Sequence, residues 1–312
     1  MKALVTGGAG FIGSHIAEAL CERGAKVIVL DNLALGAEKN LAWKRAGDDL
    51  DLVVGDVRDG KLARDLIQGC DWVFHEAALP SVPLSVEQPC ETNEQNLDAA
   101  LDWLIAARDA KVKRFLFASS SAVYGDGGAP VKRESDPPNP LSPYALQKFA
   151  AETYCQMFHR LYGLETVSFR YFNVFGPRQS FNSPYSGVIA KFCVALLKGE
   201  VPTIFGDGKQ SRDFVSIRNV VRANLLGAEG PAERVAGKVF NIGGGQSIDL
   251  LELLAELNRQ TGQNIQPKFA PPRAGDVRDS QADISKAKED LGYAVLENWQ
   301  EGLCATLGFY RA

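Results

Sequence analysis

Residues 1–31 read MKALVTGGAGFIGSHIAEALCERGAKVIVLD, and this stretch decides the fold that the sequence predicts. Lys2–Thr6 is a short apolar run that stops at glycines, and Phe11–Arg23 has apolar residues at helical spacing. Lys26–Leu30 is rich in β-branched residues, as strands are. The turn between the first strand and the helix, Gly8–Gly13, fits G-x-G-x-x-G, and Asp31 ends the second strand about twenty residues later. This context favours a dinucleotide-binding unit over a plain turn.

The same residues indicate which dinucleotide is bound. Glycines let the backbone approach a pyrophosphate, and the N-terminus of the following helix offers free N–H groups and a positive dipole end. Asp31 can accept hydrogen bonds from the adenosine ribose hydroxyls, and its charge would repel a 2′-phosphate. The sequence therefore predicts NAD rather than NADP as the cofactor.

Beyond this stretch, short apolar strands alternate with helical segments. The expected strands are Leu52–Val54, Trp72–Phe74, Phe115–Ala118 and Val167–Arg170, and the expected helices are Asn96–Ala107 and Ser142–Leu161. Such alternation predicts an α/β fold, a Rossmann-type doubly wound parallel sheet. After Phe175 the segments are less regular and rich in Gly and Pro, which indicates a smaller α/β substrate domain on the sheet's edge. We expect an NAD-binding domain over 1–172 and a substrate domain over 173–312, with some segments of the second returning to the first.

Composition excludes several classes of protein. With 46% hydrophobic and 23% charged residues, the 312-residue chain has enough apolar material for a core, which excludes a disordered or collagen-like chain. The net charge of -4 and the lack of a basic block argue against nucleic-acid binding. Six scattered cysteines form no CxxC pair, so reduced thiols and no metal site are expected. Without an apolar run of about eighteen residues or a signal peptide, the chain is expected in the cytoplasm, away from membranes.

A second motif lies in the segment Pro143–Lys148, PYALQK, where Tyr144 and Lys148 occupy positions i and i+4. Ser142 suits the N-cap and Pro143 the first helical position, so the two side chains share one helix face. A lysine charge close to a phenol favours the phenolate and lowers the pKa of the tyrosine. Tyr144 is therefore a candidate general acid–base group.

A run of serines, Ser119–Ser121, directly follows the expected strand Phe115–Ala118. The carboxyl end of a parallel strand is where such sheets bind ligands, so a hydroxyl there can contact a reacting alcohol oxygen. Y-x-x-x-K alone is common on helix surfaces. Its conjunction with the glycine turn and the serines predicts an active site.

The chain resembles the extended short-chain dehydrogenases/reductases, and within them the NAD-dependent nucleotide-sugar epimerases and dehydratases. It is most similar to UDP-N-acetylglucosamine and UDP-glucose 4-epimerases. The motifs that carry the resemblance run from residue 6 to residue 284: TGGAGFIGSHI, DNLALG, GDVRD, FHEAAL, SSSAVYGD, NPLSPYALQK, RYFNVFGPRQ, FGDGKQSRDFVSI, NIGGG and AGDVRDSQADI. In DNLALG, Ala34 and Leu35 replace the family's usual Ser/Thr pair, which removes one expected hydrogen bond to the adenosine phosphate.

The resemblance implies a catalytic trio and two sets of binding residues. The trio is Ser120, Tyr144 and Lys148. The expected cofactor contacts are Gly7, Gly10, Phe11, Ile12, Gly13, Asp31, Asn32, Gly36, Asp56, Val57, Ala77, Ala78, Leu79, Asn96, Tyr144, Lys148, Tyr171 and Phe172. The expected substrate contacts are Ser81, Ser120, Ser121, Tyr144, Asn173, Gly187, Val188, Phe192, Ile204, Phe205, Arg212, Arg273, Asp276 and Ser280.

Some substrate positions have a chemical reason of their own. Two arginines, Arg212 and Arg273, suit a diphosphate because guanidinium groups match phosphate oxygens, although surface salt bridges would be the favoured explanation without the resemblance. Phe205 with Ile204 offers an apolar shelf for a base, but core packing is as plausible. By the resemblance, Ser280 borders the C2 substituent of the hexose, where a small side chain leaves room for an acetamido group.

The expected reaction is inversion at C4 of a UDP-hexose through a transient 4-keto sugar. Tyr144 takes the proton of the 4-OH, NAD takes the C4 hydride, the keto sugar turns over, and both return to its other face. Dehydratases and decarboxylases of the family carry an acid beside the serines, where this chain has Ser121 and Ala122. A 4-epimerase of UDP-glucuronate or of unacetylated hexoses stays open. A non-catalytic NAD-binding protein would be expected to have lost Tyr144 or Lys148. A homodimer is expected.

Overall fold

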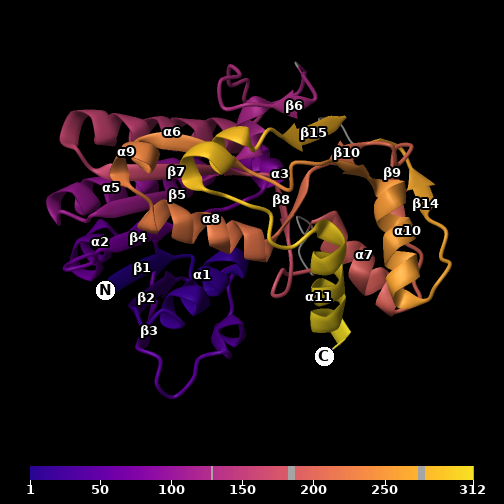
Figure 1. Ribbon diagram of the computed structural model, residues 1–312, viewed down its shortest axis with the longest axis horizontal. Coiled ribbons are helices and arrows are strands. Elements are labelled where there is room, and N and C mark those ends of the chain that lie inside the picture. The colour runs from indigo at the N-terminus through magenta and orange to yellow at the C-terminus, as the bar shows by residue number, and fades with distance from the viewer. Residues whose placement is uncertain (128, 182–186, 273–277, 312) are drawn as a thin grey trace.

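A computed structural model describes residues 1–127, 129–181, 187–272 and 278–311 of the chain (Figure 1). Within them, a central sheet of seven parallel strands has the order β12-β7-β5-β4-β1-β2-β3. Its strands are β1 (Lys2–Thr6), β2 (Lys26–Asp31), β3 (Leu50–Val54), β4 (Trp72–His75), β5 (Arg114–Ser120), β7 (Glu165–Tyr171) and β12 (Lys238–Ile242). The chain lays β2 and β3 on one side of β1 and then crosses to place β4 on the other side. This reversal makes a topological switch point at the carboxyl ends of β1 and β4.

Helices cover both faces of this sheet, because its strands are buried on both sides. On one face, α1 (Phe11–Cys21) and α8 (Ile217–Glu229) pack with η4 (Ala287–Leu291) in an apolar core that includes Ile16, Val220 and Leu291. On the other face, α2 (Gly60–Leu66), α5 (Ala99–Asp109) and α6 (Pro143–Tyr162) share a core around Trp103. The predicted doubly wound α/β architecture is therefore present.

Helix α6 shows how local sequence fixes an element that carries the predicted motif. The Ser142 hydroxyl accepts a hydrogen bond from the Ala145 N–H (3.2 Å), and Pro143 stands at the first helical position. The helix ends at Gly163, whose φ of +73° suits a residue without a side chain. Tyr144 is thus held in the first turn and Lys148 in the next.

Shorter elements connect these layers. They are η1 (Glu38–Leu41), α3 (Val82–Glu87), α4 (Pro89–Asn93), the π-helical turn η2 (Glu94–Asp98), η3 (Ser121–Tyr124), β6 (Val131–Lys132) and α9 (Ala232–Val235).

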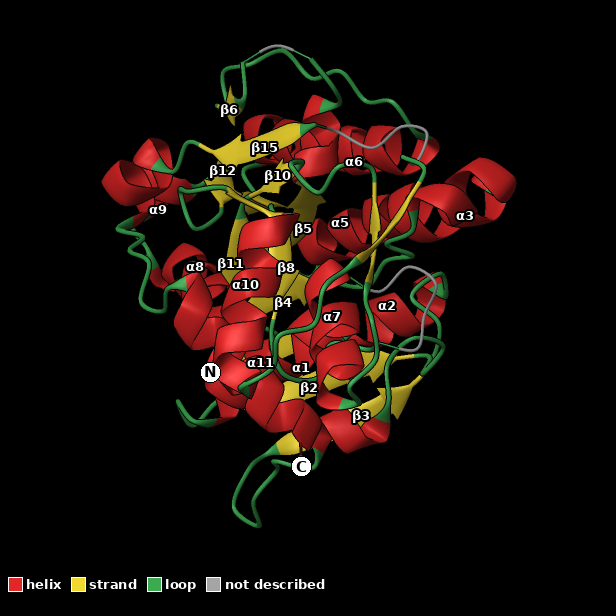
Figure 2. Cartoon of the chain, turned by 90° about the vertical axis from the view of Figure 1, so that its right-hand side faces the viewer, coloured by secondary structure: helices red, strands yellow, loops and turns green. Residues whose placement is uncertain are grey.

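The second part of the chain builds three small sheets and a separate apolar core. The sheets are β13-β10-β15-β6, β11-β8 and β14-β9. Their remaining strands are β8 (Asn173–Phe175), β9 (Thr203–Phe205), β10 (Ser211–Arg212), β11 (Phe214–Ser216), β13 (Ile248–Asp249), β14 (Lys268–Ala270) and β15 (Asp279–Ala282). The core lies among α7 (Val188–Leu197), α10 (Leu250–Thr261) and α11 (Trp299–Arg311), which Figure 2 shows in front of the central sheet.

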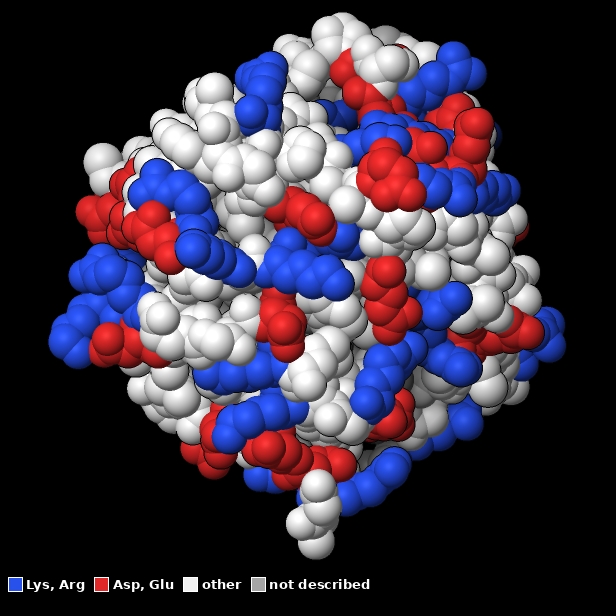
Figure 3. Space-filling view, turned by 60° about the vertical axis from the view of Figure 1, so that its left-hand side comes forward, with Lys and Arg blue, Asp and Glu red and all other residues white. Residues whose placement is uncertain are grey.

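Segments beyond residue 172 also complete the central sheet. Strand β12 pairs with β7 at its edge, and α8 packs against α1. The division at residue 172 stays a prediction, since the two parts are interleaved in this way. Charged side chains of both signs alternate over the face shown in Figure 3. Among the described residues, no helix combines the length and hydropathy needed to cross a bilayer.

Candidate active site

The glycine turn between β1 and α1 lies at the switch point and is packed too tightly for side chains. Gly7 has a φ of +66°, and a Cβ added there would lie 2.8 Å from the Ala77 nitrogen. At Gly13, a Cβ would lie 2.3 Å from the Gly7 carbonyl oxygen. Because α1 begins at Phe11, its first N–H groups face the turn without helical partners. The turn therefore fits a pyrophosphate group.

Asp31, at the end of β2, organises the loop that the resemblance assigns to the adenosine ribose. Its carboxylate is buried and accepts hydrogen bonds from the N–H groups of Ala9 (3.0 Å) and Leu33 (2.8 Å). A Cβ at Gly36 would lie 2.8 Å from both carboxylate oxygens, so glycine is needed there. A carboxylate offers about four acceptor positions, so two remain for ribose hydroxyls.

Asp56 and Val57, two of the expected cofactor contacts, follow β3. Arg58 forms two side-chain hydrogen bonds to Asp56 (3.0 and 2.8 Å) and holds the pKa of that carboxyl at about 2. Asn32 contacts the same carboxylate (3.5 Å). Val57 is buried, and its carbonyl accepts a hydrogen bond from the Trp103 indole. Sequence reasoning missed Arg58, although it stands within the quoted motif GDVRD.

Asn96 joins the segment after β4 to the catalytic helix. It lies in the π-helical turn η2, a geometry that is frequent at functional sites. Its amide accepts from the Leu79 N–H (2.8 Å) and donates to Gln147 of α6 (2.9 Å). Ala77 donates its N–H to Thr6 (3.3 Å). The predicted cofactor residues 77–79 and 96 therefore lie together at the sheet edge, and their contacts with NAD stay predictions.

The predicted trio comes together at the carboxyl end of β5. Ser120 ends this strand, and a hydrogen bond links it with Tyr144 on α6. Lys148 is buried; its Nζ donates to the Ala118 carbonyl (2.8 Å) and lies 5.0 Å from the centre of the Phe117 ring. Serine, tyrosine and lysine side chains thus surround the end of one central strand.

The expected lowering of the Tyr144 pKa by Lys148 is wrong for these side chains alone. Burial raises the pKa of Tyr144, and the hydrogen bond with Ser120 opposes this only in part. Lys148 is itself desolvated, which lowers its pKa to about 8. Burial disfavours the charged form of both groups. At neutral pH, these side chains alone keep Tyr144 as a phenol.

Buried polar groups that the sequence analysis missed hold the end of β5 against α6. Glu152 on α6 accepts hydrogen bonds from Ser119 (2.6 Å) and from Arg170 of β7 (2.6 and 3.0 Å). The Arg170 guanidinium also lies over the Tyr124 ring (4.7 Å). Glu152 stands four positions after Lys148, which in hindsight was the available signal.

A second missed group lies at Glu76, directly after β4. Its Oε1 lies 3.1 Å from the hydroxyl of Tyr171, which also accepts from Asn224 (2.7 Å). Tyr171 and Phe172, both expected cofactor contacts, are buried. The motif FHEAAL contains Glu76, but a single carboxylate there gave no distinct signal.

The predicted substrate residues divide between sheet edges and core. Arg212 of β10 is paired with Ser280 of β15, and Arg212 donates to the carbonyls of Ser211 (2.8 Å) and Arg278 (3.3 Å). Asn173 of β8 donates to the Asp213 carbonyl (3.3 Å). Arg273 and Asp276 lie outside the described residues.

The other predicted substrate residues have structural surroundings of their own. Ser81 caps α3 by accepting from the Leu84 N–H (3.1 Å), Ser121 begins η3, and exposed Gly187 precedes α7. Phe192 and Ile204 are buried in the third core, and Val188 packs against it. Phe205 is partly exposed. Core packing therefore accounts for Phe192 and Ile204.

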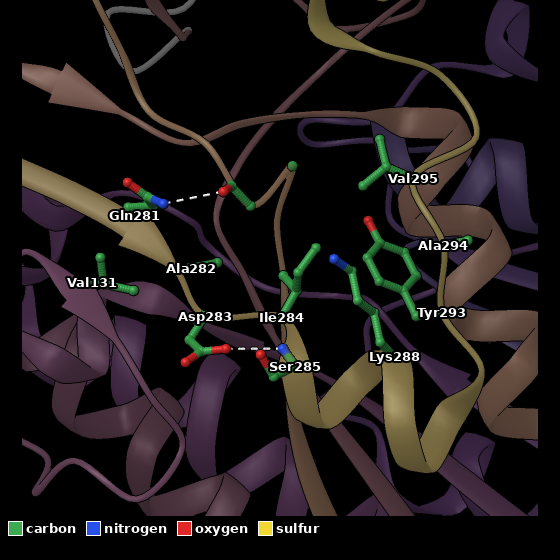
Figure 4. A pocket seen from close by; sticks show the side chains of 12 residues that line it. Val131, Gln281, Ala282, Asp283, Ile284, Ser285, Lys288, Tyr293, Ala294 and Val295 are labelled. Atoms are coloured by element: carbon green, nitrogen blue, oxygen red, sulfur yellow. Dashed lines mark hydrogen bonds between the residues drawn. The ribbon is translucent and has the colours of Figure 1, made fainter.

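A separate cavity of about 600 Å³ lies between β15, η4 and the loop that follows η4 (Figure 4). Its polar side chains bind neighbouring groups: Gln281 donates to the Gly245 carbonyl and Asp283 accepts from the Ser285 N–H (Figure 4). None of the predicted site residues that the structure describes line it.

A family model described as the NAD dependent epimerase/dehydratase family matches residues 3–243. The chain belongs to this family. The match covers the glycine turn, the trio and most of the motifs that carry the resemblance. The recognition made from the sequence is confirmed, and NAD is the cofactor on which the family depends.

Solved and curated relatives cover nearly the whole chain. UDP-N-acetylglucosamine 4-epimerase from Methanobrevibacter ruminantium M1, in complex with UDP-N-acetylmuramic acid, is 40% identical with a TM-score of 0.94 and covers 99% of this chain and 98% of its own. UDP-glucose 4-epimerase from Thermotoga maritima, with UDP-glucose, is 39% identical with a TM-score of 0.94, covering 100% and 99%. UDP-glucose 4-epimerase of Mycolicibacterium smegmatis is 38% identical, covering 100% and 99%. These likenesses confirm the Rossmann-type α/β fold.

Proposed function

We propose that this protein is an NAD-dependent UDP-hexose 4-epimerase, an isomerase that inverts C4 of UDP-N-acetylglucosamine and UDP-N-acetylgalactosamine and also of UDP-glucose and UDP-galactose. The observation that carries this proposal is the meeting of Ser120, Tyr144 and Lys148 at the end of β5, beside the glycine turn. Relatives of both sugar classes support it.

The chain's own residues divide the work of the reaction. NAD, when bound, supplies a hydride acceptor that returns the hydride to C4. In its phenolate form, the Tyr144 oxygen takes the proton of the sugar 4-OH and becomes a phenol; it gives the proton back after the keto sugar has turned over. The Ser120 hydroxyl donates a hydrogen bond to the phenolate oxygen. The Lys148 ammonium stabilises the phenolate charge, which allows Tyr144 to lose its own proton and act as a base.

The glycine turn and the Asp31 loop would hold the dinucleotide in place for this chemistry. The N–H groups of Phe11 and Ile12 would bind its pyrophosphate at the start of α1. The two free acceptor positions of Asp31 would bind the ribose hydroxyls. Asn96 would fix the segment at Leu79 beneath it.

On the substrate side, the pairing of β10 with β15 supports a common binding edge. It places the Arg212 backbone beside that of Ser280, so a diphosphate contact and a sugar contact would lie on neighbouring strands. Serine at 280, glycine at 187 and serine at 81 are small, which favours acceptance of an acetamido group at C2. This is the reason for including acetylated sugars in the proposal.

Assembly and location follow from more general features. We infer a cytoplasmic homodimer: the six cysteines are free, and α6 exposes Leu146, Leu161 and Tyr162, each more than half accessible.

The discriminating experiment is a comparison of four substrates with purified protein. UDP-glucose, UDP-galactose and the two N-acetylated sugars are each incubated with the enzyme, UDP-glucuronate is incubated alongside as the rival substrate, and the C4 epimers are separated and quantified. Conversion of both pairs supports the full proposal. Conversion of the unacetylated pair alone would restrict it, and turnover of UDP-glucuronate alone would replace it. Release of NAD on denaturation, with no NADP, checks the cofactor.

A further inference from the structure

Glu76 is a charged side chain at the centre of the site to which the proposed reaction gives no role. It directly follows β4 at the switch point, and its N–H donates to the Thr6 carbonyl at the end of β1 (3.2 Å). A Cβ at Gly7 would lie 3.1 Å from the Glu76 carbonyl carbon, so its backbone underlies the glycine turn. Its carboxylate therefore belongs to the same sheet edge as the predicted cofactor residues.

The hydrogen bonds around Glu76 have a defined direction. Asn224 on α8 donates Nδ2 to the Tyr171 hydroxyl oxygen (2.7 Å) and to the Val220 carbonyl (2.9 Å). This leaves the Tyr171 hydroxyl proton free for Glu76 Oε1, 3.1 Å away. The chain from Asn224 through Tyr171 to Glu76 thus presents one donor to the carboxylate and favours its ionised form.

This arrangement is a poor one for stability. Among the described residues, Glu76 Oε2 and Asn224 Oδ1 are buried and have no hydrogen-bond partner. A buried carboxylate with one hydrogen bond lowers the free energy of unfolding, whereas an amide or an apolar side chain of similar size would lower it less. Features that break a packing rule in this way are expected at functional sites.

Strand β4 pairs with β5 in a register that sets His75 opposite Phe117, so Glu76 lies level with Ala118. The Ala118 carbonyl accepts a hydrogen bond from Lys148 Nζ (2.8 Å), and Lys148 of α6 is therefore the charged group that faces Glu76. Burial raises the pKa of Glu76 to about 7, while the Tyr171 hydrogen bond and the charge of Lys148 lower it. In turn, Glu76 and Cys155 oppose the lowering of the Lys148 pKa by burial. His75, the next residue back along the chain, is stacked on Phe115 and Phe117 and is held neutral by burial.

We propose that Glu76, held by Tyr171 and Asn224, is a positioning residue of the epimerase site that acts on Tyr144 through Lys148. Its buried negative charge keeps the Lys148 side chain in the ammonium form, and the ammonium stabilises the Tyr144 phenolate during proton transfer. This inference rests on the catalytic roles proposed for Tyr144 and Lys148. In this role, Glu76 does not touch the reacting atoms, but it controls the charge of Lys148.

The test compares Glu76→Gln and Tyr171→Phe with the wild type and with Glu134→Gln. Glu134 is a matched control, because burial also raises its pKa and its carboxylate accepts a hydrogen bond from the Asn241 N–H (2.8 Å). It differs from Glu76 in the cations that face it, which are Arg170 and Lys286. Glu76→Gln keeps the shape and removes the charge. Tyr171→Phe keeps the charge and removes its donor, so a failure of one variant to fold leaves the other.

Two readouts are needed. The first is kcat and KM as functions of pH. The second is the pH dependence of Lys148 acylation by acetic anhydride, read by mass spectrometry on the protein without substrate. We expect the alkaline limb of kcat, and the midpoint of Lys148 acylation, to fall by about one pH unit in Glu76→Gln. Tyr171→Phe should shift both in the same direction by less, and Glu134→Gln should shift neither. KM for the UDP-sugar should stay unchanged, and Glu76→Gln should unfold no earlier than the wild type.

Unchanged kcat profiles and Lys148 acylation in both Glu76→Gln and Tyr171→Phe would overturn the inference while leaving the proposed function intact. Equal shifts in Glu134→Gln would also overturn it, because the effect would then be one of general charge. Full activity of Tyr144→Phe would instead refute the proposed catalytic roles themselves.

Discussion

Tyr144 is the side chain on which the proposed chemistry depends most directly. Tyr144→Phe keeps the ring in the first turn of α6 and removes the proton-transfer group. General acid–base groups typically contribute about 10²–10⁴-fold, so we expect kcat to fall by at least that factor with NAD still bound. Tyr162→Phe, at the exposed end of the same helix, is the matched control and should keep wild-type turnover. Near-normal turnover by Tyr144→Phe would contradict its role.

Ser280 tests the breadth of the substrate range at the same scale. Ser280→Tyr adds a ring on β15 beside Arg212, where the resemblance places the C2 substituent. Steric exclusion discriminates between ligands more strongly than a lost contact. We expect kcat/KM to fall selectively for UDP-N-acetylglucosamine and its C4 epimer, with UDP-glucose and UDP-galactose much less affected. An equal loss on all four substrates would show that Ser280 supports the fold and does not border C2.

Single residues also show where sequence reasoning is strong and where it stops. The positions of Ser120, Tyr144 and Lys148 were predictable, because spacing along one helix and one strand end determines them. The direction of the Tyr144 pKa was not predictable, since burial depends on groups that pack from elsewhere in the chain. Glu76, Tyr171 and Asn224 are also far apart in sequence, and only tertiary packing brings them into contact.

At the scale of elements, the start of α6 couples stability to activity. Removing the Ser142 cap should cost about 1 kcal/mol, because the Ala145 N–H loses its acceptor. Tyr144 lies within that first turn, so Ser142→Ala should also lower kcat more than the stability loss explains. Asp249→Ala removes the comparable cap of α10, in which the Asp249 side chain accepts a hydrogen bond from the Glu252 N–H (2.8 Å). It should lower the unfolding free energy similarly and leave kcat unchanged; equal kcat losses would contradict the argument.

The seven-stranded sheet illustrates the same limit for elements. Strands β1 to β5 and β7 of this sheet were predictable within a few residues, because each is an apolar run between helical segments. Strand β12 was not predicted, although Lys238–Ile242 is similarly apolar, because its partner β7 lies far back in the chain. Likewise, the capping role of Ser81 depends on a six-residue helix that periodicity does not reveal.

At the scale of the whole molecule, buried polar groups tie the catalytic edge to the rest of the fold. Arg170 of β7 and Glu152 of α6 form an ion pair buried on both sides, at 2.6 Å. Removing one partner of such a pair leaves the other charge buried and unpaired, which typically lowers the free energy of unfolding by about 3–5 kcal/mol. The architecture that holds Ser120 therefore depends on side chains outside the predicted cofactor and substrate contacts.

The pH dependence of unfolding tests this coupling between burial and charge through His75. Burial among aromatic rings lowers the pKa of His75 from 6.5 to about 3. Below pH 6.5, His75 of the unfolded chain therefore binds a proton, whereas His75 of the folded protein stays neutral down to about pH 3. The stability that is present above pH 6.5 is consequently lost as the pH falls from 6.5 to about 3. Other groups, such as Asp213 with a pKa raised to about 6 by burial, contribute with the opposite sign.

Those other contributions cancel when the wild type is compared with His75→Gln, because both proteins share them. We expect the unfolding free energy of the wild type to decline more steeply on acidification, by up to about 1.4 kcal/mol per pH unit below pH 6.5. The measurement is urea unfolding of both proteins at several pH values between about 4 and 7. The stability of the wild type relative to His75→Gln should therefore fall as the pH falls, whichever protein is the more stable at neutral pH. A difference that stays constant over this range would show that His75 titrates alike in the folded and unfolded chains, and that burial among the rings does not hold it neutral.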